Sequence, residues 1–172
     1  SADPLATITS SLAPKSNWNE WRASVGTHRL GKITIAPPWL ASASDSEIEV
    51  VIEPAMAFGT GEHATTRGVV RLMQQLSEIP PTVADLGAGS AVLSICAAKL
   101  GATRVVAIEL DHDAIGNAEE NIAANGVSGA VDIIEGDAGV LLPLIAPVGL
   151  VLANIISSVL IGLLPVIGDS QT

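Results

Sequence analysis

The chain has 172 residues, of which 48% are hydrophobic, so it can bury one substantial core and is expected to form a single globular domain with a short extension. Its formal net charge of -10 disfavours a nucleic-acid partner and suits a basic one. Tyrosine is absent and Phe58 is the only phenylalanine, which also excludes a series of aromatic side chains on which bases could stack.

The single cysteine and the apolar C-terminal part bear on the setting of the protein. Cys96 lies in an apolar run and is interpreted as a small buried residue, which favours a reducing, cytoplasmic setting. No signal peptide is evident. Residues 138–168 contain no charge and are numerous enough to span a membrane, but three prolines divide them. We therefore predict a buried strand and helix without membrane contact.

Three segments can be distinguished along the chain. Residues 1–17 are rich in Ser, Thr, Ala and Pro without periodicity, which predicts a flexible lead-in. Residues 18–47 are predicted to be a linker with one strand, because residues 30–35 alternate before a Pro-Pro stop. Residues 48–172 are expected to form the main domain, which starts with a strand over residues 48–52.

A glycine-rich loop precedes the first predicted helix of the main domain. The loop, residues 58–66, ends in Thr65 and Thr66, whose hydroxyl groups are suited to cap a helix. Apolar residues then recur at helical spacing from Val69 to Leu76. A loop followed by a helix is predicted here.

From Val83 onward, predicted strands and helices alternate. Strands are expected over 83–86, 104–109, 131–134 and 149–153. Helices are expected over about 91–100 and about 113–124, where Gly101 and Asn125-Gly126 end them. This alternation predicts right-handed crossovers and an α/β fold with a doubly wound parallel sheet.

The turn after the first of these strands has the features of a ligand-binding bend. Asp85-Leu-Gly87-Ala-Gly89 lies where a strand passes into a helix, and open parallel sheets bind ligands at that edge. The two glycines let the backbone approach a ligand closely. Glu109 ends the next strand, where a carboxylate can accept hydrogen bonds from both ribose hydroxyls. A nucleoside-containing cofactor is therefore expected.

A nicotinamide or flavin dinucleotide is the main alternative ligand. Its fingerprint has a third glycine where this chain has Val92. The Asp85 carboxylate would also repel a pyrophosphate, whereas it would tolerate a cationic sulfonium and an amino-acid moiety. These observations favour S-adenosylmethionine, and a turn with a purely structural role is the other alternative.

Several segments of the chain resemble a known family. Residues 85–89 are similar to the first motif of class I S-adenosylmethionine-dependent methyltransferases, and residues 107–111 resemble their second. Residues 52–66 and 153–156 more specifically resemble the ribosomal-protein methyltransferases of the PrmA type. That family methylates amino groups, on lysine side chains and the N-terminus, of a large-subunit ribosomal protein. The resemblance implies a Rossmann-like core and a basic ribosomal-protein partner.

The resemblance also implies which residues contact S-adenosylmethionine. Among them, Gly87 would meet its amino-acid part, Glu109 would hold the ribose, and Asp137 would lie near the adenine. The residues expected to bind the cofactor are Thr66, Asp85, Gly87, Gly89, Glu109, Asp137 and Asn154.

Two residues are expected to act on the substrate. Methyl transfer needs an amine lone pair in line with the methyl group, so positioning should dominate. Asn154 can accept a hydrogen bond from the amine through its side-chain oxygen, or it can be a polar cap of the strand. Phe58 can place its ring against the sulfonium or the substrate ammonium, or simply pack in its loop. His63 is a weaker candidate for a base, and no metal site is expected.

The chain departs from the pattern of the family at several positions. Glu53 and Glu109 stand where aspartate is usual, Glu62 replaces a threonine, and Ala91 replaces a glycine that a helical backbone would make dispensable. The family's substrate-recognition domain and last three strands are missing, which predicts an incomplete sheet whose apolar edge favours self-association. Methylation of another protein lysine or a small amine, and cofactor binding without catalysis, stay open as alternatives.

Overall fold

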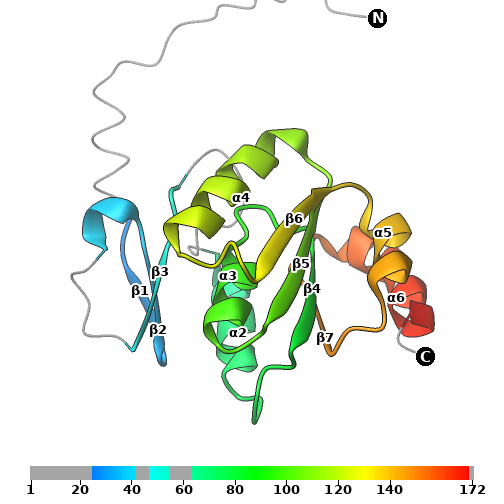
Figure 1. Ribbon diagram of the computed structural model, residues 1–172, viewed down its shortest axis with the longest axis horizontal. Coiled ribbons are helices and arrows are strands. Elements are labelled where there is room, and N and C mark those ends of the chain that lie inside the picture. The colour runs from blue at the N-terminus through cyan, green and yellow to red at the C-terminus, as the bar shows by residue number, and fades with distance from the viewer. Residues whose placement is uncertain (1–24, 42–46, 55–62, 171–172) are drawn as a thin grey trace, which may run out of the picture.

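A computed structural model describes residues 25–41, 47–54 and 63–170 of the protein (Figure 1). The predicted lead-in, Phe58 and Glu62 lie outside these ranges. The described residues form a three-stranded sheet of order β1-β2-β3 and a four-stranded sheet of order β6-β5-β4-β7. Helices lie between the two sheets and on the far side of the larger one (Figure 1).

The larger sheet is parallel throughout and is the scaffold of the candidate site. Its strands are β4 (Thr82–Leu86), β5 (Arg104–Glu109), β6 (Val131–Glu135) and β7 (Leu150–Ala153). The first of them in sequence, β4, pairs with β5 on one side and with β7 on the other, so the strand order reverses beside it. This arrangement confirms the predicted α/β fold with a doubly wound sheet, and the four strands begin and end within one residue of the prediction.

Helices cover both faces of this sheet. The helices α3 (Val92–Lys99) and α4 (His112–Ala124) pack on one face, and α5 (Ala138–Ile145) and α6 (Ser157–Ser170) lie on the other (Figure 1). Residues 92–97 of α3 are all buried, because this helix lies between the two sheets. A helix covered on all sides needs apolar residues all around, which explains why α3 lacks a polar face.

The smaller sheet corrects one prediction. Residues 30–35 are predicted to form one strand, but Gly31 and Lys32 form a turn between β1 (His28–Leu30) and β2 (Ile33–Ala36), which are antiparallel. Gly31 has a φ of 65°, a conformation that favours glycine and suits a two-residue hairpin. The strand predicted over 48–52 is present as β3 (Ile48–Val51), which pairs in parallel with β2. A short 3-10 helix, η1 (Pro38–Leu40), follows β2.

The helix α2 (Ala64–Met73) begins before the two threonines that are predicted to cap it. Its N-cap is His63, whose side chain makes no capping hydrogen bond, so the prediction that Thr65 and Thr66 are caps is wrong. Both threonines lie inside the first turn, and Thr66 is buried. The buried face is formed by residues at positions i, i+4 and i+7, namely Thr66, Val70 and Met73.

The apolar C-terminal part is predicted to form a buried strand and helix, and the structure has the strand β7 followed by α6, preceded by the unpredicted helix α5. The prediction that the helix is buried is wrong, because Leu163 is the one buried residue of α6. Pro143 lies inside α5 and Pro165 inside α6, so neither divides the stretch. Both prolines are exposed, where a missing backbone N–H is tolerated more easily than in the core. No helix within the described ranges is both long and apolar enough to cross a membrane. The predicted self-association stays a prediction; β7 is at a sheet edge, and Val159 and Ile161 of α6 are exposed.

Candidate functional site

The residues predicted to bind a ligand gather at the carboxyl ends of the parallel strands. Asp85 and the glycine turn end β4, Glu109 ends β5, and Asn154 directly follows β7. Because β4 lies between β5 and β7, these three strand ends are neighbours. They meet where the strand order reverses, which is the usual ligand position in open α/β sheets.

Glu109 joins the glycine turn to the end of β5. Its Oε2 accepts a hydrogen bond from the backbone N–H of Gly89 at 2.7 Å. Its Oε1 accepts from the backbone N–H groups of Leu110 at 2.8 Å and Asp111 at 2.9 Å. A carboxylate offers about four acceptor positions, so Oε2 keeps one for a further donor. The two places predicted to hold one ligand therefore lie side by side.

Gly87 is packed more closely than the sequence suggests. Its φ is 70°, and its N–H donates to the carbonyl oxygen of Ile108 at 2.8 Å, which fixes the turn against β5. A Cβ added at Gly87 would overlap Cγ2 of Ile155. The space on this side of Gly87 is thus filled by Ile155, which sequence reasoning missed, and a ligand can reach only the remaining faces of the turn.

The expectation that Ala91 has a helical backbone is wrong. Its φ of 63° and ψ of 19° place it in the left-handed region, as the N-cap of α3. Its N–H donates to the carbonyl oxygen of Ala88 at 2.9 Å, so the residue closes the turn before the helix starts. The position favours glycine, and alanine is retained here at a conformational cost of about 1–2 kcal/mol.

Asp85 is a buried carboxyl group below the turn. Its Oδ2 accepts a hydrogen bond from the hydroxyl of Ser94 in α3 at 2.6 Å. Its Oδ1 is buried and has no hydrogen-bond partner among the described residues. Burial raises the pKa of Asp85 to about 6; hydrogen bonds from Ser94 oppose this effect, and the charge of Glu109 adds to it. The only sequence feature that indicates the Ser94 contact is the presence of a serine among the apolar residues 92–98 of α3.

We expect Asp85→Asn to stabilise the protein at pH 8 by about 1–2 kcal/mol and to leave stability at pH 4 nearly unchanged. The raised pKa means that Asp85 contributes most below its unfolded-state pKa of 3.8 and that this contribution is lost as the pH rises through about 6. The full shift corresponds to about 3 kcal/mol, part of which an imperfectly paired amide would offset. Urea unfolding at both pH values measures the difference.

The exposed Asp132 of β6 supplies the control for this prediction, since Asp132→Asn removes the same charge without relieving burial. A gain in stability of equal size in both variants would show that net charge, and not the buried position of Asp85, is responsible.

Thr66 and Asn154 are in contact although 88 residues separate them. The side-chain nitrogen of Asn154 donates to the hydroxyl oxygen of Thr66 at 2.9 Å. This bond places the first turn of α2 beside the end of β7 and fixes the rotation of the amide. Among the described residues, no group donates to the side-chain oxygen of Asn154, so this oxygen can accept a hydrogen bond from a ligand.

Asp137 lies at the end of β6 and is the N-cap of α5. Its carboxylate accepts from the N–H of Gly139 at 2.7 Å, and its side chain is exposed. The neighbouring Gly136 donates to the backbone oxygen of Glu109 at 2.8 Å, so Asp137 is close to the end of β5. This position is compatible with a contact between Asp137 and a ligand, and the contact stays a prediction.

Two features beside Glu109 were missed from the sequence. Leu110 directly follows Glu109 and is 69% exposed. His112 Nδ1 lies 2.8 Å from Glu135 Oε2, and this hydrogen bond together with the charge of Glu135 raises the pKa of His112. His112 closely follows the end of β5, and Glu135 ends the neighbouring strand β6. Their pairing could therefore have been inferred from the register of the two strands.

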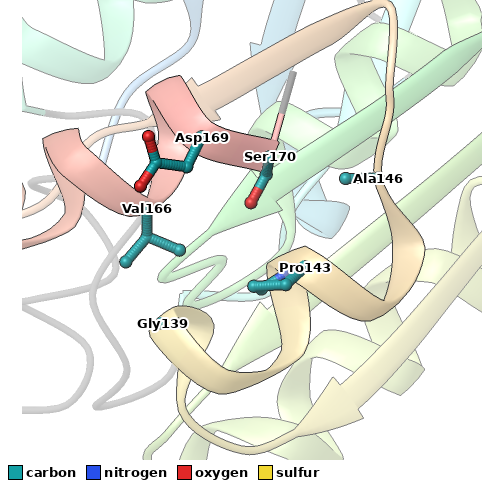
Figure 2. A pocket seen from close by; sticks show the side chains of 6 residues that line it. All are labelled: Gly139, Pro143, Ala146, Val166, Asp169 and Ser170. Carbon is teal, nitrogen blue, oxygen red and sulfur yellow. The ribbon is translucent and has the colours of Figure 1, made fainter. Parts of the chain in front are cut away.

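Within the described ranges, the candidate site included, no group of three or more His, Cys, Asp or Glu side chains is arranged to hold a metal ion. A hollow lies between α5 and α6, with side chains of both helices around it (Figure 2). It shares no residue with the predicted site. Its lining residues are Gly139, Pro143, Ala146, Val166, Asp169 and Ser170.

The chain is similar to known proteins over nearly its whole length. The sequence model of the family described as "Ribosomal protein L11 methyltransferase (PrmA)" matches residues 4–171. A ribosomal protein L11 methyltransferase of Myxococcus xanthus is 39% identical over 97% of this chain and 58% of its own length. The protein of that name from Geotalea daltonii is 40% identical over 84% of this chain and 49% of its own length. The chain thus spans about half the length of the curated relatives it matches.

Solved structures agree with the sequence relatives. A ribosomal protein L11 methylase from Lactobacillus delbrueckii subsp. bulgaricus superposes with a TM-score of 0.73 at 29% identity, covering 85% of this chain and 75% of that chain. An RNA methyltransferase from Salinibacter ruber, solved with S-adenosyl-L-homocysteine, superposes with a TM-score of 0.51 at 29% identity over 60% of this chain and 67% of its own.

Proposed function

Because the chain belongs to the ribosomal protein L11 methyltransferase (PrmA) family, we propose that it binds S-adenosylmethionine as part of an enzyme that methylates amino groups of ribosomal protein L11. The contact between Gly89 N and Glu109 Oε2 carries the proposal, because it unites the glycine turn and the carboxylate in one site. The acidic net charge suits a basic ribosomal protein as substrate. A ribosomal substrate and the lone, buried Cys96 favour a cytoplasmic setting.

The described residues fit this cofactor. The unpartnered Oδ1 of Asp85 places a carboxylate below the turn, which suits the positive charges of a sulfonium and an α-ammonium group. The remaining acceptor position of Glu109 suits a ribose hydroxyl. The exposed side chain of Leu110 and the nearby Asp137 suit an adenine base, the first through apolar contact and the second as a hydrogen-bond acceptor.

The bound cofactor supplies a methyl group that its sulfonium sulfur makes electrophilic. In this proposal, Asn154 orients the attacking amine: its nitrogen is held by Thr66, and its oxygen accepts a hydrogen bond from the amine. Holding the amine lone pair in line with the methyl group accelerates the transfer by positioning, without general acid or base catalysis. Phe58, outside the described residues, stays the predicted neighbour of the sulfonium or the substrate ammonium.

Calorimetric titration tests the cofactor assignment. The protein should bind S-adenosylmethionine and S-adenosylhomocysteine with micromolar affinity, about −8 kcal/mol, and should not bind NAD detectably. Transfer of radiolabelled methyl groups to purified ribosomal protein L11 tests the substrate. Tight binding of NAD, or of neither ligand, would refute the proposal, whereas cofactor binding without transfer would reduce it to a cofactor-binding function.

Asn154→Ala is expected to lower the methyl-transfer rate at least tenfold while changing the affinity for S-adenosylmethionine less than threefold, because the amide oxygen is assigned to the amine. Thr66→Val should reproduce part of the rate loss, since it removes the hydroxyl that orients the amide, and Thr66→Ser should retain activity. Equal rates in all three variants and the unchanged protein would show that Asn154 is only a polar end of β7.

A further inference from the structure

Three asparagines, two in α4 and Asn125 at its C-cap, hold the main chain at the end of β3 and just beyond it. Asn125 Oδ1 accepts from Val51 N at 2.9 Å, and its Nδ2 donates to Val51 O at 2.6 Å. One turn earlier, Asn121 Oδ1 accepts from Glu53 N at 2.9 Å, and Asn117 Nδ2 donates to Glu53 O at 3.4 Å. The four-residue spacing of the asparagines places all three on one face of the helix.

Asn121 differs from Asn125 because it also reaches the glycine turn. Its Nδ2 donates to the backbone oxygen of Ser90 at 3.1 Å, and Ser90 follows Gly89, whose N–H is bound by Glu109. Asn121 is only 1% exposed. A buried hydrogen bond of this kind leaves an unsatisfied group when it is broken, so the contact constrains the turn strongly. One side chain thus links the turn to the chain at Glu53.

We propose that Asn121 is a positioning residue of the cofactor site, which sets the place of the glycine turn relative to the end of β3. The inference rests on the proposed function and extends it to a residue outside both methyltransferase motifs. This role needs no contact between Asn121 and the cofactor. It acts through Ser90, by holding the backbone that carries Gly89.

Asn121→Asp and Asn125→Asp form a matched pair. Each introduced carboxyl group keeps an acceptor for a backbone N–H, that of Val51 or Glu53, and loses the amide donor, but only the change at Asn121 removes a donor to the glycine turn. Both variants should have a lower Tm. Measured by calorimetry well below each Tm, S-adenosylmethionine should bind the Asn121→Asp protein about tenfold more weakly, and the Asn125→Asp protein like the unchanged one. A merely structural role would lower Tm without changing this affinity.

The pH profile gives a second readout of the same variant. When protonated, the carboxyl group introduced at position 121 regains a donor for Ser90 O. The affinity deficit relative to the unchanged protein at the same pH should therefore shrink between about pH 8.5 and about pH 5.5. A deficit that stays constant would count against the proposed contact.

Hydrogen exchange on the unchanged protein covers the case in which Asn121→Asp does not fold. Binding of S-adenosylmethionine should slow exchange of Glu53 N–H, the partner of Asn121, about tenfold more than exchange of Val51 N–H, the partner of Asn125. Equal protection, or equal affinity of the two variants, would overturn the role of Asn121 and leave the proposed function standing. No binding by the unchanged protein would overturn both.

Discussion

Gly87→Ala is expected to destabilise the protein by about 3 kcal/mol or more and to abolish detectable cofactor binding in the fraction that folds. The residue has a φ of 70°, and a left-handed conformation costs a non-glycine residue about 1–2 kcal/mol. The added Cβ would also overlap Cγ2 of Ile155, and overpacking of this kind costs about 1–3 kcal/mol. Ile155 cannot easily yield, because a β-branched side chain has few rotamers. Urea unfolding and calorimetric titration measure the two effects.

Gly126→Ala is the matched control for this prediction. Gly126 has a φ of 68°, almost the same as Gly87, but an added Cβ would meet no atom within 4 Å. Its substitution should therefore cost about 1–2 kcal/mol, which is the conformational part alone. The difference between the two variants measures the contact with Ile155.

Ile155→Ala completes a double-mutant cycle with Gly87→Ala. Removal of Cγ2 should recover at least about 1 kcal/mol of the loss caused by Gly87→Ala, so the two changes should be less destabilising together than their sum. Additive effects would mean that Ile155 does not fill the space beside Gly87. The side of the turn assigned here to packing would then be open to the cofactor.

The central part of the fold could be predicted because its signals are local. The alternation of apolar runs from Val83 to Ala153 determines the four parallel strands, and the turn at Gly87 with Glu109 at the next strand end predicts their proximity. The hairpin at Gly31 is not predicted, because a glycine within an alternating segment is compatible with one continuous strand. The preference of Gly31 for a tight turn outweighs the alternating pattern of the flanking residues.

The contacts that complete the site depend on packing between distant segments. No periodicity indicates that Asn154 bonds to Thr66 or that Ile155 covers Gly87, because these contacts follow from where β7 and α2 lie in space. The asparagines of α4 did leave a signal. Asparagine is unfavourable inside helices, so its repetition at four-residue spacing, as in Asn117 and Asn121, indicates partners outside the helix.

Glu109→Gln is expected to weaken binding of S-adenosylmethionine about 100-fold, equivalent to about 2.7 kcal/mol. The carboxylate accepts from three backbone N–H groups, and its remaining acceptor position is assigned to a ribose hydroxyl. A glutamine oxygen can retain Leu110 and Asp111, but the amide nitrogen would then point a donor at the N–H of Gly89. The variant thus loses the charge-assisted bond to the ligand and the link to the turn together.

Two comparisons separate these losses. Glu109→Asp keeps the charge but is one methylene shorter, so it cannot reach Gly89 while bonding to Leu110 and Asp111, and it should bind the cofactor more weakly than the unchanged protein but more tightly than Glu109→Gln. Glu120→Gln, an exposed position of α4, removes the same charge and should not change affinity. If Glu109→Gln bound S-adenosylmethionine as tightly as Glu120→Gln does, Glu109 would stabilise the glycine turn without contacting the ribose. The nucleoside would then have to lie elsewhere along the strand ends.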